Sequence, residues 1–428
     1  MHRGDEGGGR TEDRPLRRSR QGITVLTGSR VVLGLVGCVD YELQLSSSML
    51  EQLVAEYQIR DGELTSSVPV TNERDLILSM LAYIKQDVGG ERFVASADAL
   101  STFAARFPKR ISLGGTSVRA ALAMSRLGVP STLHLASIND YMRRLLPPAC
   151  DYICSAREDT LYPHLIVQYE QDIRVRVGDV NLHAPFPNRL IYVNDPPNEA
   201  LVLSDELGSM LFDADIFLIS GFNSMRDQDA LDERLLTLRR HMRQLPSHAL
   251  VYYEDAAFHE PAFSRRVRKA LLEVIDVYGL NEDEMQAHLG YQIDLLSVTG
   301  VEQALKSLRT LIPAPTLVVH TKYWSLVLGA GASEYAEAVR SGMVMASAHY
   351  CHGDDFTDEQ HGLIRSLPMR PGARAFATAL EERMGAVVRC LPGFTLDVAR
   401  PTTVGLGDAF VGGFLAALRQ VERRASWT

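Results

Sequence analysis

The chain has 428 residues, of which 46% are hydrophobic and 23% charged, so it can bury one large core or a large and a small one. Its formal net charge of −9 argues against a nucleic acid as partner, because proteins that bind nucleic acids usually carry an excess of basic residues. No apolar run reaches the roughly 18 residues of a membrane-spanning helix, so we expect no membrane association.

The cysteines indicate a reduced protein. They are scattered and odd in number, at Cys38, Cys150, Cys154, Cys351 and Cys390. Cys150 and Cys154 lack a second pair of Cys or His nearby, which argues against a zinc site built on them. We therefore expect a cytoplasmic protein.

The N-terminal segment differs from the rest of the chain. Residues 1–30 are rich in Gly, Arg, Asp and Glu, and they contain almost no apolar side chain before Ile23. They also lack the apolar stretch of a signal peptide. We expect a disordered tail, or a start codon assigned too early, ahead of the ordered domain at residues 31–428.

The first ordered element is a continuous apolar run, Val31–Asp40, typical of a strand buried on both faces of a parallel sheet. Asp40 stands at its end, where carboxylates of an open α/β sheet reach the ligand crevice. The run therefore predicts a core strand that ends in a binding residue. The alternative is that Asp40 is only a turn residue.

Two segments further along carry candidate ligand contacts. Residues 75–85 place apolar side chains on one face and predict an amphipathic helix, followed by a loop that contains Glu91. Later, Gly114 and Gly115 form a turn before a helix of small residues. The start of that helix, with Thr116, could face a ligand, although close packing of its alanines explains the pattern equally well.

Residues 162–192 have a different pattern of apolar residues from the segments on either side. Three short apolar runs are separated by turn residues, without helical segments between them. This favours an antiparallel patch rather than the strand–helix alternation on either side of it. We interpret it as part of a smaller inserted α/β lid, at residues about 41–110 and 160–200, on a doubly wound, mostly parallel sheet flanked by helices.

The parallel core resumes after this patch. One strand ends at Glu254, and another is followed directly by Asn281-Glu-Asp-Glu284. Locally this motif has the spacing of a helix capping box, with Asn281 as the cap and Glu284 three residues later. Two further strands, over 316–320 and 324–328, flank a hairpin turn.

The motif Gly405-Leu-Gly-Asp408 is a short loop that leads into an apolar helix from Asp408 to about Leu418. Glycines let backbone N–H groups approach a ligand, and a helix start adds unpaired donors, so this segment suits a phosphate. A carboxylate there repels phosphate, but it can take a proton from an incoming hydroxyl while the anion hole stabilises the developing charge. The alternative is Asp408 as a helix N-cap.

Three carboxylates are expected along the same sheet edge, namely Glu254, Glu284 and Asp408. Oxygen ligands of this kind suit Mg²⁺, which is usually bound together with substrate phosphates. The combination predicts a phosphoryl-transfer site with one Mg²⁺ per active site. A dehydrogenase is disfavoured, because no G-x-G-x-x-G follows the first strand.

Together these motifs resemble those of the ADP-dependent glucokinases and phosphofructokinases, within the ribokinase-like superfamily. Gly405-Leu-Gly-Asp408 matches the family motif GXGD, and Asn281-Glu-Asp-Glu284 matches NXXE. The segments 188–195 and 320–324 look like family segments that ATP-using ribokinases lack, which favours the ADP-dependent branch. The resemblance covers residues 32–418.

The resemblance implies a role for each candidate residue. Asp408 would accept the proton, with Gly405 and Gly407 in the anion hole, and Glu254 and Glu284 would join Asp408 around Mg²⁺. Sugar contacts are implied at Asp40, Glu91, Gly114, Gly115, His164 and Arg189. Nucleotide contacts are implied at Asn281, His320, Lys322, Val404 and Leu406. Thr116 departs from the family, which usually has Asn after the two glycines.

The leading interpretation is a Mg²⁺-dependent enzyme that transfers the β-phosphoryl group of ADP to a hydroxyl of glucose or fructose 6-phosphate in glycolysis. Its partners would be small molecules, a sugar and a nucleotide, and it would be a monomer or a small homo-oligomer. Two alternatives stay open: an ATP-using carbohydrate or nucleoside kinase of the same superfamily, and a non-catalytic sugar or nucleotide sensor. The retained Asp408 and glycines argue against a sensor, which needs no base.

Overall fold

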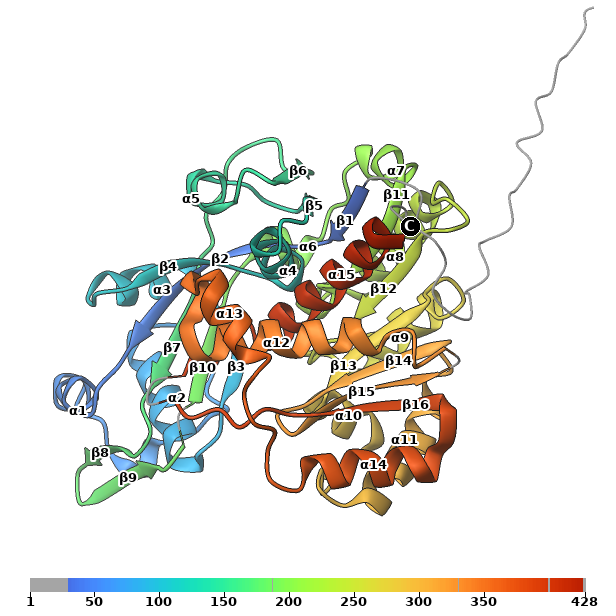
Figure 1. Cartoon of the computed structure of the whole chain (residues 1–428). Coiled ribbons are helices and arrows are strands. Elements are labelled where there is room, and N and C mark those ends of the chain that lie inside the picture. The colour runs from blue at the N-terminus through green and yellow to red at the C-terminus, as the bar shows by residue number, and fades with distance from the viewer. Residues whose placement is uncertain (1–29, 187, 330, 399–400, 426–428) are drawn as a thin grey trace, which may run out of the picture.

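The computed structural model describes residues 30–186, 188–329, 331–398 and 401–425, and Figure 1 shows its elements in chain order. The disordered tail expected at residues 1–30 lies outside the described residues, except for Arg30, which begins the first strand. Within the described ranges, no helix is both long and apolar enough to cross a membrane.

A large, mostly parallel sheet forms the centre of the molecule. In the described part of the chain it has nine strands in the order β16-β15-β14-β13-β12-β11-β1-β5-β6. Neighbours from β14 to β6 are parallel, whereas β15 is antiparallel to β14 and β16. The strands are β1 (Arg30–Gly34), β5 (Ser131–Leu135), β6 (Cys150–Cys154), β11 (Ala214–Ile219), β12 (Leu250–Glu254), β13 (Val277–Asn281), β14 (Thr316–His320), β15 (Trp324–Gly329) and β16 (Val388–Pro392).

Both faces of this sheet are covered, so alternate residues of each strand enter two different hydrophobic cores. Val31 and Leu33 of β1 pack on one face, and Val32 packs on the other. The first face carries α4 (Thr116–Arg126), α5 (Asp140–Leu145), α12 (Ala336–His352), α13 (Asp358–Ile364) and α15 (Leu406–Ala425). The second carries α7 (Glu206–Leu211), α8 (Gln228–Met242), α9 (Pro261–Leu271), α10 (Glu282–Leu289), α11 (Val298–Leu311) and α14 (Ala373–Met384). This arrangement confirms the predicted doubly wound core.

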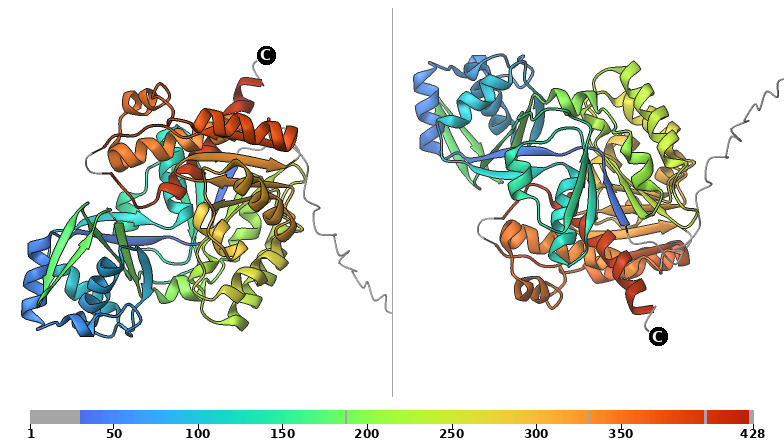
Figure 2. Two further views of the ribbon diagram at one scale, coloured as in Figure 1. Left: turned by 90° about the horizontal axis from the view of Figure 1, so that it is seen from below. Right: turned by 90° about the horizontal axis from the view of Figure 1, so that it is seen from above.

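A smaller sheet lies beside the large one, as the two views of Figure 2 show. Over the described residues its order is β3-β10-β7-β2-β4, with β2/β7 and β3/β10 parallel and the other pairs antiparallel. Its strands are β2 (Cys38–Gln44), β3 (Gly90–Phe93), β4 (Arg110–Gly114), β7 (His164–Tyr169) and β10 (Asn188–Val193). A separate hairpin is formed by β8 (Ile173–Val177) and β9 (Val180–Ala184), and the connecting helices are α1 (Ser47–Glu56), α2 (Glu73–Gln86), α3 (Ala97–Ala105) and α6 (Pro196–Ala200).

The two faces of the small sheet differ in polarity. One face packs Leu165, Val167 and Tyr192 into a core with α1, α2 and α3. The period of two then places Asp40 and His164 on the opposite face, which meets the large sheet's ligand edge. The movement of this sheet as a lid over that edge stays a prediction.

The apolar run Val31–Asp40 is two strands in two different sheets, so the predicted single core strand was wrong. β1 ends at Gly34, and β2 starts at Cys38 in the small sheet. The chain passes between the sheets at Gly37, where a Cβ would lie 2.5 Å from Val118 Cγ2. Both strands are buried, so hydrophobicity does not mark the change of sheet. Asp40 consequently lies within β2 and not at the end of a core strand.

A second correction concerns Glu91, which was expected in a loop. It belongs to β3, at the edge of the small sheet, where it pairs in register with Ile191 of β10. The short strand has no apolar alternation, because Glu91 is exposed and the other three residues are only partly buried. The antiparallel patch itself contains one strand that the sequence did not predict, β9.

Candidate active site

Asp408 occupies the first turn of α15, at the edge where the two sheets meet. The helix starts at Leu406, two residues earlier than expected, and the Gly405 carbonyl accepts a hydrogen bond from the Ala409 amide (2.9 Å). Gly405 therefore holds the cap position, and the N-cap alternative for Asp408 was wrong. The Asp408 side chain is 23% exposed, so it is available to a ligand.

The two glycines of this motif lie close to side chains of other elements. Gly405 has φ +73°, and a Cβ there would lie 2.7 Å from Arg119 Cδ, so a side chain would be excluded on both counts. A Cβ on Gly407 would lie 3.2 Å from His320 Cε1. The bare backbone thus leaves the first amides of α15 open toward a ligand.

Arg119 of α4, which sequence reasoning missed, joins the base to the small sheet. Its guanidinium donates to Asp40 Oδ2 at 2.8 Å, and its Nε lies 4.0 Å from Asp408 Oδ2. Burial opposes its charge, but Asp40, Asp408 and Asp354 together raise the pKa of Arg119 above its usual range. Arg119 is therefore a buried cation shared between Asp40 and the candidate base.

Asp40 lies in a polar cluster on the open face of the small sheet. His164 is paired with it across β2 and β7, with Nδ1 3.9 Å from Asp40 Oδ1. On β4, Gly114 is the residue opposite Cys38, and a Cβ there would lie 2.5 Å from Asp40 Oδ2. Gly115 follows with φ +87° and precedes α4, the helix that carries Arg119.

Glu254 and His320 form a buried pair beneath Gly407. His320 Nε2 donates to Glu254 Oε1 at 2.9 Å, and its ring stacks on Phe410 of α15 with centroids 4.7 Å apart. The second oxygen of Glu254 is buried and has no hydrogen-bond partner among the described residues. Burial raises the pKa of Glu254, and Asp408 adds to that shift, while His320 counteracts it.

Glu284 lies at the start of α10, where the capping box is present as predicted. Asn281 donates to it twice, from its backbone amide to Oε2 at 2.7 Å and from its side chain to Oε1 at 2.9 Å. Burial raises the pKa of Glu284 well above its usual value, with further contributions from Asp255 and Glu254. Several carboxylates thus repel one another here, which is the environment that a bound cation would relieve.

These carboxylates fit Mg²⁺ on the chemistry of the donor set. Glu254 offers a buried oxygen that has no partner among the described residues, and Asp408 offers a partly exposed one. Glu284 already accepts hydrogen bonds at both oxygens, so its contact with an ion would pass through water. Hard oxygen ligands that retain waters are the usual surroundings of Mg²⁺.

Arg189 of β10 is half-buried and faces this site. Burial lowers the pKa of Arg189, whereas Asp408 and Glu91 raise it, which places both carboxylates within its electrostatic reach. Within the described ranges its guanidinium forms no hydrogen bond or ion pair. Glu91 itself lies 3.4 Å from His259, with Oε1 facing Nε2.

Three of the predicted nucleotide contacts differ in their exposure. Lys322 is exposed, and its ammonium lies 5.1 Å from the centroid of the Tyr323 ring. Leu406 is half-buried at the first position of α15. Val404 is buried, and its carbonyl accepts a hydrogen bond from His349 Nε2 at 2.8 Å.

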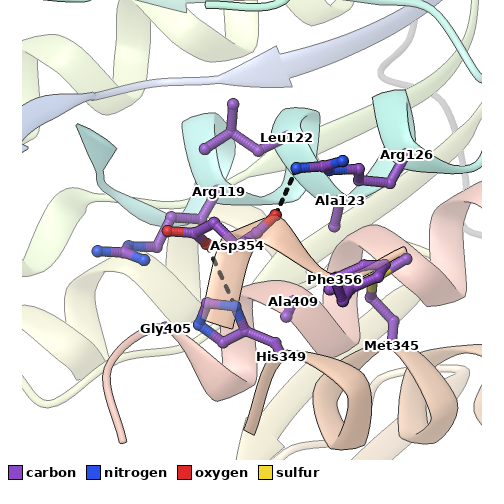
Figure 3. A pocket seen from close by; sticks show the side chains of 10 residues that line it. All are labelled: Arg119, Leu122, Ala123, Arg126, Met345, His349, Asp354, Phe356, Gly405 and Ala409. Carbon is purple, nitrogen blue, oxygen red and sulfur yellow. Dashed lines mark hydrogen bonds and ion pairs between the residues drawn. The ribbon is translucent and has the colours of Figure 1, made fainter. Parts of the chain in front are cut away.

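A charged network behind the Gly405 loop was not predicted. Asp354 pairs with His349 Nδ1 at 3.2 Å and with Arg110, and its carbonyl accepts from Arg126 at 2.6 Å. Figure 3 shows Asp354, His349 and Arg126 around a cavity of about 30 Å³ that Gly405 and Arg119 also line. Because His349 also donates to Val404, the network fixes the loop before α15.

The sequence matches a family model, and the fold is similar to those of solved structures. Residues 29–416 match the family model described as the ADP-specific phosphofructokinase/glucokinase conserved region. A search of curated proteins finds no match. The fold is similar to a hypothetical ADP-dependent phosphofructokinase from Pyrococcus horikoshii OT3, with TM-score 0.73, 16% identity, and coverage of 94% of this chain and 100% of that one.

Two further solved structures have the same fold. A phosphofructokinase from Pyrococcus horikoshii OT3 with AMP has TM-score 0.70 and 16% identity, with 94% of this chain and 100% of that chain covered. An ADP-dependent kinase complex with fructose-6-phosphate and ADPbetaS has TM-score 0.71 and 10% identity, with 91% and 94% covered. At such identities these likenesses show the fold, while the family rests on the sequence match.

Proposed function

The chain belongs to the ADP-specific phosphofructokinase and glucokinase family of sugar kinases, and we propose that it transfers the β-phosphoryl group of ADP to a hydroxyl of fructose 6-phosphate. The observation that carries this proposal is the placement of Asp408 beside Arg119 and the Gly405 loop, with Asp40 on the facing sheet. One carboxylate is thus available as a base, and an anion hole adjoins it.

The residues divide the chemistry between them. Asp408 accepts the proton of the attacking sugar hydroxyl, and the amides at the start of α15 stabilise the charge on the transferred group. Asp40, fixed by Arg119, holds the sugar so that its hydroxyl points at Asp408. Glu254, Glu284 and Asp408 would hold one Mg²⁺, which neutralises charge on the phosphates when bound.

Arg189 favours a phosphorylated sugar over glucose as the acceptor. Its guanidinium is half-buried, faces Asp408, and lacks a partner in the described part of the chain. A sugar phosphate would supply the missing anion through two parallel hydrogen bonds. Glucose has no group that can do this.

Changing Arg189 to Ala is expected to raise KM for fructose 6-phosphate by about 10–100-fold, the equivalent of one or two charged hydrogen bonds. KM for ADP should change much less. Arg174→Ala is the matched control, because Arg174 is exposed on the β8–β9 hairpin. Steady-state kinetics with each substrate varied in turn measures the two KM values. Equal effects of the two variants on KM for fructose 6-phosphate would contradict a role of Arg189 in binding the sugar phosphate.

Changing Glu284 to Gln is expected to raise the Mg²⁺ concentration for half-maximal activity by about 10–100-fold. The variant keeps an oxygen that can accept from the Asn281 amide, but it loses the charge that would hold the water shell of the ion. Thermal melting should change little, because the lost charge is one that burial disfavours. A lower Tm with unchanged Mg²⁺ dependence would leave Glu284 with a capping role only.

The acceptor is tested by supplying ADP and Mg²⁺ with fructose 6-phosphate or glucose and measuring kcat/KM for each. We expect fructose 6-phosphate to be the better substrate. Preference for glucose would move the chain to the glucokinase type and remove the role of Arg189. Turnover of neither sugar would contradict the proposed function.

A further inference from the structure

Three chemically different metal-ligand atoms meet on the open face of the small sheet. Cys38 and Asp40 are two residues apart on β2, so their side chains leave the strand on the same face, and His164 is paired with Asp40 across β7. A sulfur, an oxygen and a nitrogen from these residues all lie within 4.8 Å of one another. Asp40 Oδ1 is 3.4 Å from Cys38 Sγ and 3.9 Å from His164 Nδ1.

These separations are close to those of a tetrahedral zinc site. Ligand atoms that lie about 2.0–2.3 Å from Zn²⁺ are about 3.3–3.8 Å apart along a tetrahedron edge. Only small side-chain rotations are therefore needed for the three atoms to share one ion. Gly114 leaves space for such a movement, since a Cβ there would lie 2.6 Å from Cys38 Sγ.

The ring of His164 is oriented as metal-binding histidines are. Its Nε2 lies 3.2 Å from Asp195 Oδ2, and Asp195 is itself held by the side chain of Asn198 at 2.7 Å. A carboxylate that accepts from one ring nitrogen directs the other toward a metal ion. Here the other nitrogen, Nδ1, is the one that faces Asp40.

We propose that Cys38, Asp40 and His164 bind a thiophilic divalent cation of the Zn²⁺ class, separately from the Mg²⁺ carboxylates around Glu254. The sulfur and imidazole ligands select against Mg²⁺, which prefers oxygen. On binding, the thiol proton of Cys38 and any proton on His164 Nδ1 are released to solvent, and the Cys38 thiolate becomes a ligand. The fourth position is left for water, and the His164 side chain, 17% exposed, provides the opening to solvent.

The site has a consequence that rests on the proposed function. Asp40 cannot ligate the cation and hold the sugar in the same geometry. A bound Zn²⁺ therefore excludes fructose 6-phosphate and inhibits the enzyme. The zinc site that the sequence argued against would have used Cys150 and Cys154, whereas this one draws on residues up to 126 positions apart.

Titrating the full-length protein with Co²⁺, in the absence of sugar and nucleotide, tests the site independently of kinase activity. We expect one Co²⁺ per chain to bind with near-ultraviolet absorption from a cobalt–thiolate bond and with the visible bands of a tetrahedral ion. Zn²⁺ should abolish the signal and Mg²⁺ should not. Absence of the thiolate band in the wild-type protein overturns the proposal.

Variants identify the ligands. Cys38→Ser should lose the thiolate band, whereas Cys351→Ser, a half-buried cysteine outside the cluster, should keep it. Asp195→Asn should weaken Co²⁺ binding by about 10–100-fold, because the three ligand residues remain while the carboxylate that orients His164 is lost. A band that persists in Cys38→Ser overturns the site. If Cys38→Ser does not fold by circular dichroism, His164→Gln must lose the visible bands instead, and their retention overturns it equally.

Competition links the cation site to the sugar. Fructose 6-phosphate should raise the apparent Kd for Co²⁺ in the wild-type protein. If fructose 6-phosphate leaves Co²⁺ binding unchanged, the cation site stands, but the proposed inhibition and the sugar contact at Asp40 are overturned. Loss of the cation site and loss of the sugar contact are therefore distinguished by different measurements.

Discussion

Replacing Asp408 with Asn is expected to lower kcat by about 10²–10⁴-fold, the usual contribution of a positioned general base. Asn has nearly the shape of Asp but cannot take the proton of the sugar hydroxyl. The fold should persist, because the Gly405 carbonyl and not the Asp408 side chain starts the hydrogen bonding of α15. The lost charge at the helix start costs only about 0.3–1 kcal/mol.

The matched control is Asp358→Asn, an exposed aspartate in the first turn of α13. It removes a charge from the same kind of helix position at a place outside the candidate site. We expect kcat of Asp358→Asn to be within about twofold of the wild type. The wild type and both variants should have equal affinity for ADP by calorimetry. Near-normal turnover of Asp408→Asn would remove Asp408 from the role of base.

Replacing Arg119 with Leu is expected to lower the free energy of unfolding by about 3–5 kcal/mol. The Arg119 and Asp40 side chains are only 6% and 4% exposed, so the change leaves a buried carboxylate without its cation. Urea unfolding followed by circular dichroism measures the loss. Because Arg119 also lies 4.0 Å from Asp408, turnover should fall as well.

Two further variants show whether the buried pair is the cause. Arg126→Leu, on the same helix, removes a guanidinium that is 45% exposed and should cost less than about 1 kcal/mol. Adding Asp40→Asn to Arg119→Leu should recover part of the loss, because the uncompensated charge is then gone. A loss no larger than that of Arg126→Leu would show that Asp40 does not depend on Arg119.

The parallel core was predictable because its signals are local. The strand expected to end at Glu254 is β12, Leu250–Glu254, and the motif at Asn281 caps α10 with the expected hydrogen bonds. In each case a buried strand and the helix after it are adjacent in the sequence, so periodicity and turn residues suffice to place them.

The change of sheet between Gly34 and Cys38 could not be predicted in this way. Both β1 and β2 are buried, and residues 31–39, which join them, contain no polar interruption. Only the pairing of β2 with β4 and β7, which are distant in sequence, shows where the first strand ends.

The role of Arg119 could not be predicted from the sequence, because it depends on an ion pair with Asp40, which is 79 positions away. In the sequence it precedes the small residues Ala120 and Ala121, and an arginine at a helix surface is ordinarily solvated. The network of Asp354 with His349 and Arg110 could not be predicted for the same reason, since it joins segments up to 244 residues apart. The sequence motifs therefore predict candidate reacting groups, but not the buried charged residues that position them.

The central claim is that the β-phosphoryl group of ADP moves to the sugar, and ³¹P NMR tests it directly. The purified protein is incubated with Mg²⁺, fructose 6-phosphate and either ADP or ATP. We predict that AMP and a sugar bisphosphate accumulate in equal amounts from ADP, and that ATP supports slower turnover, because its additional phosphate would extend past the Gly405–Asp408 loop. Faster release of ADP from ATP than of AMP from ADP would contradict the account.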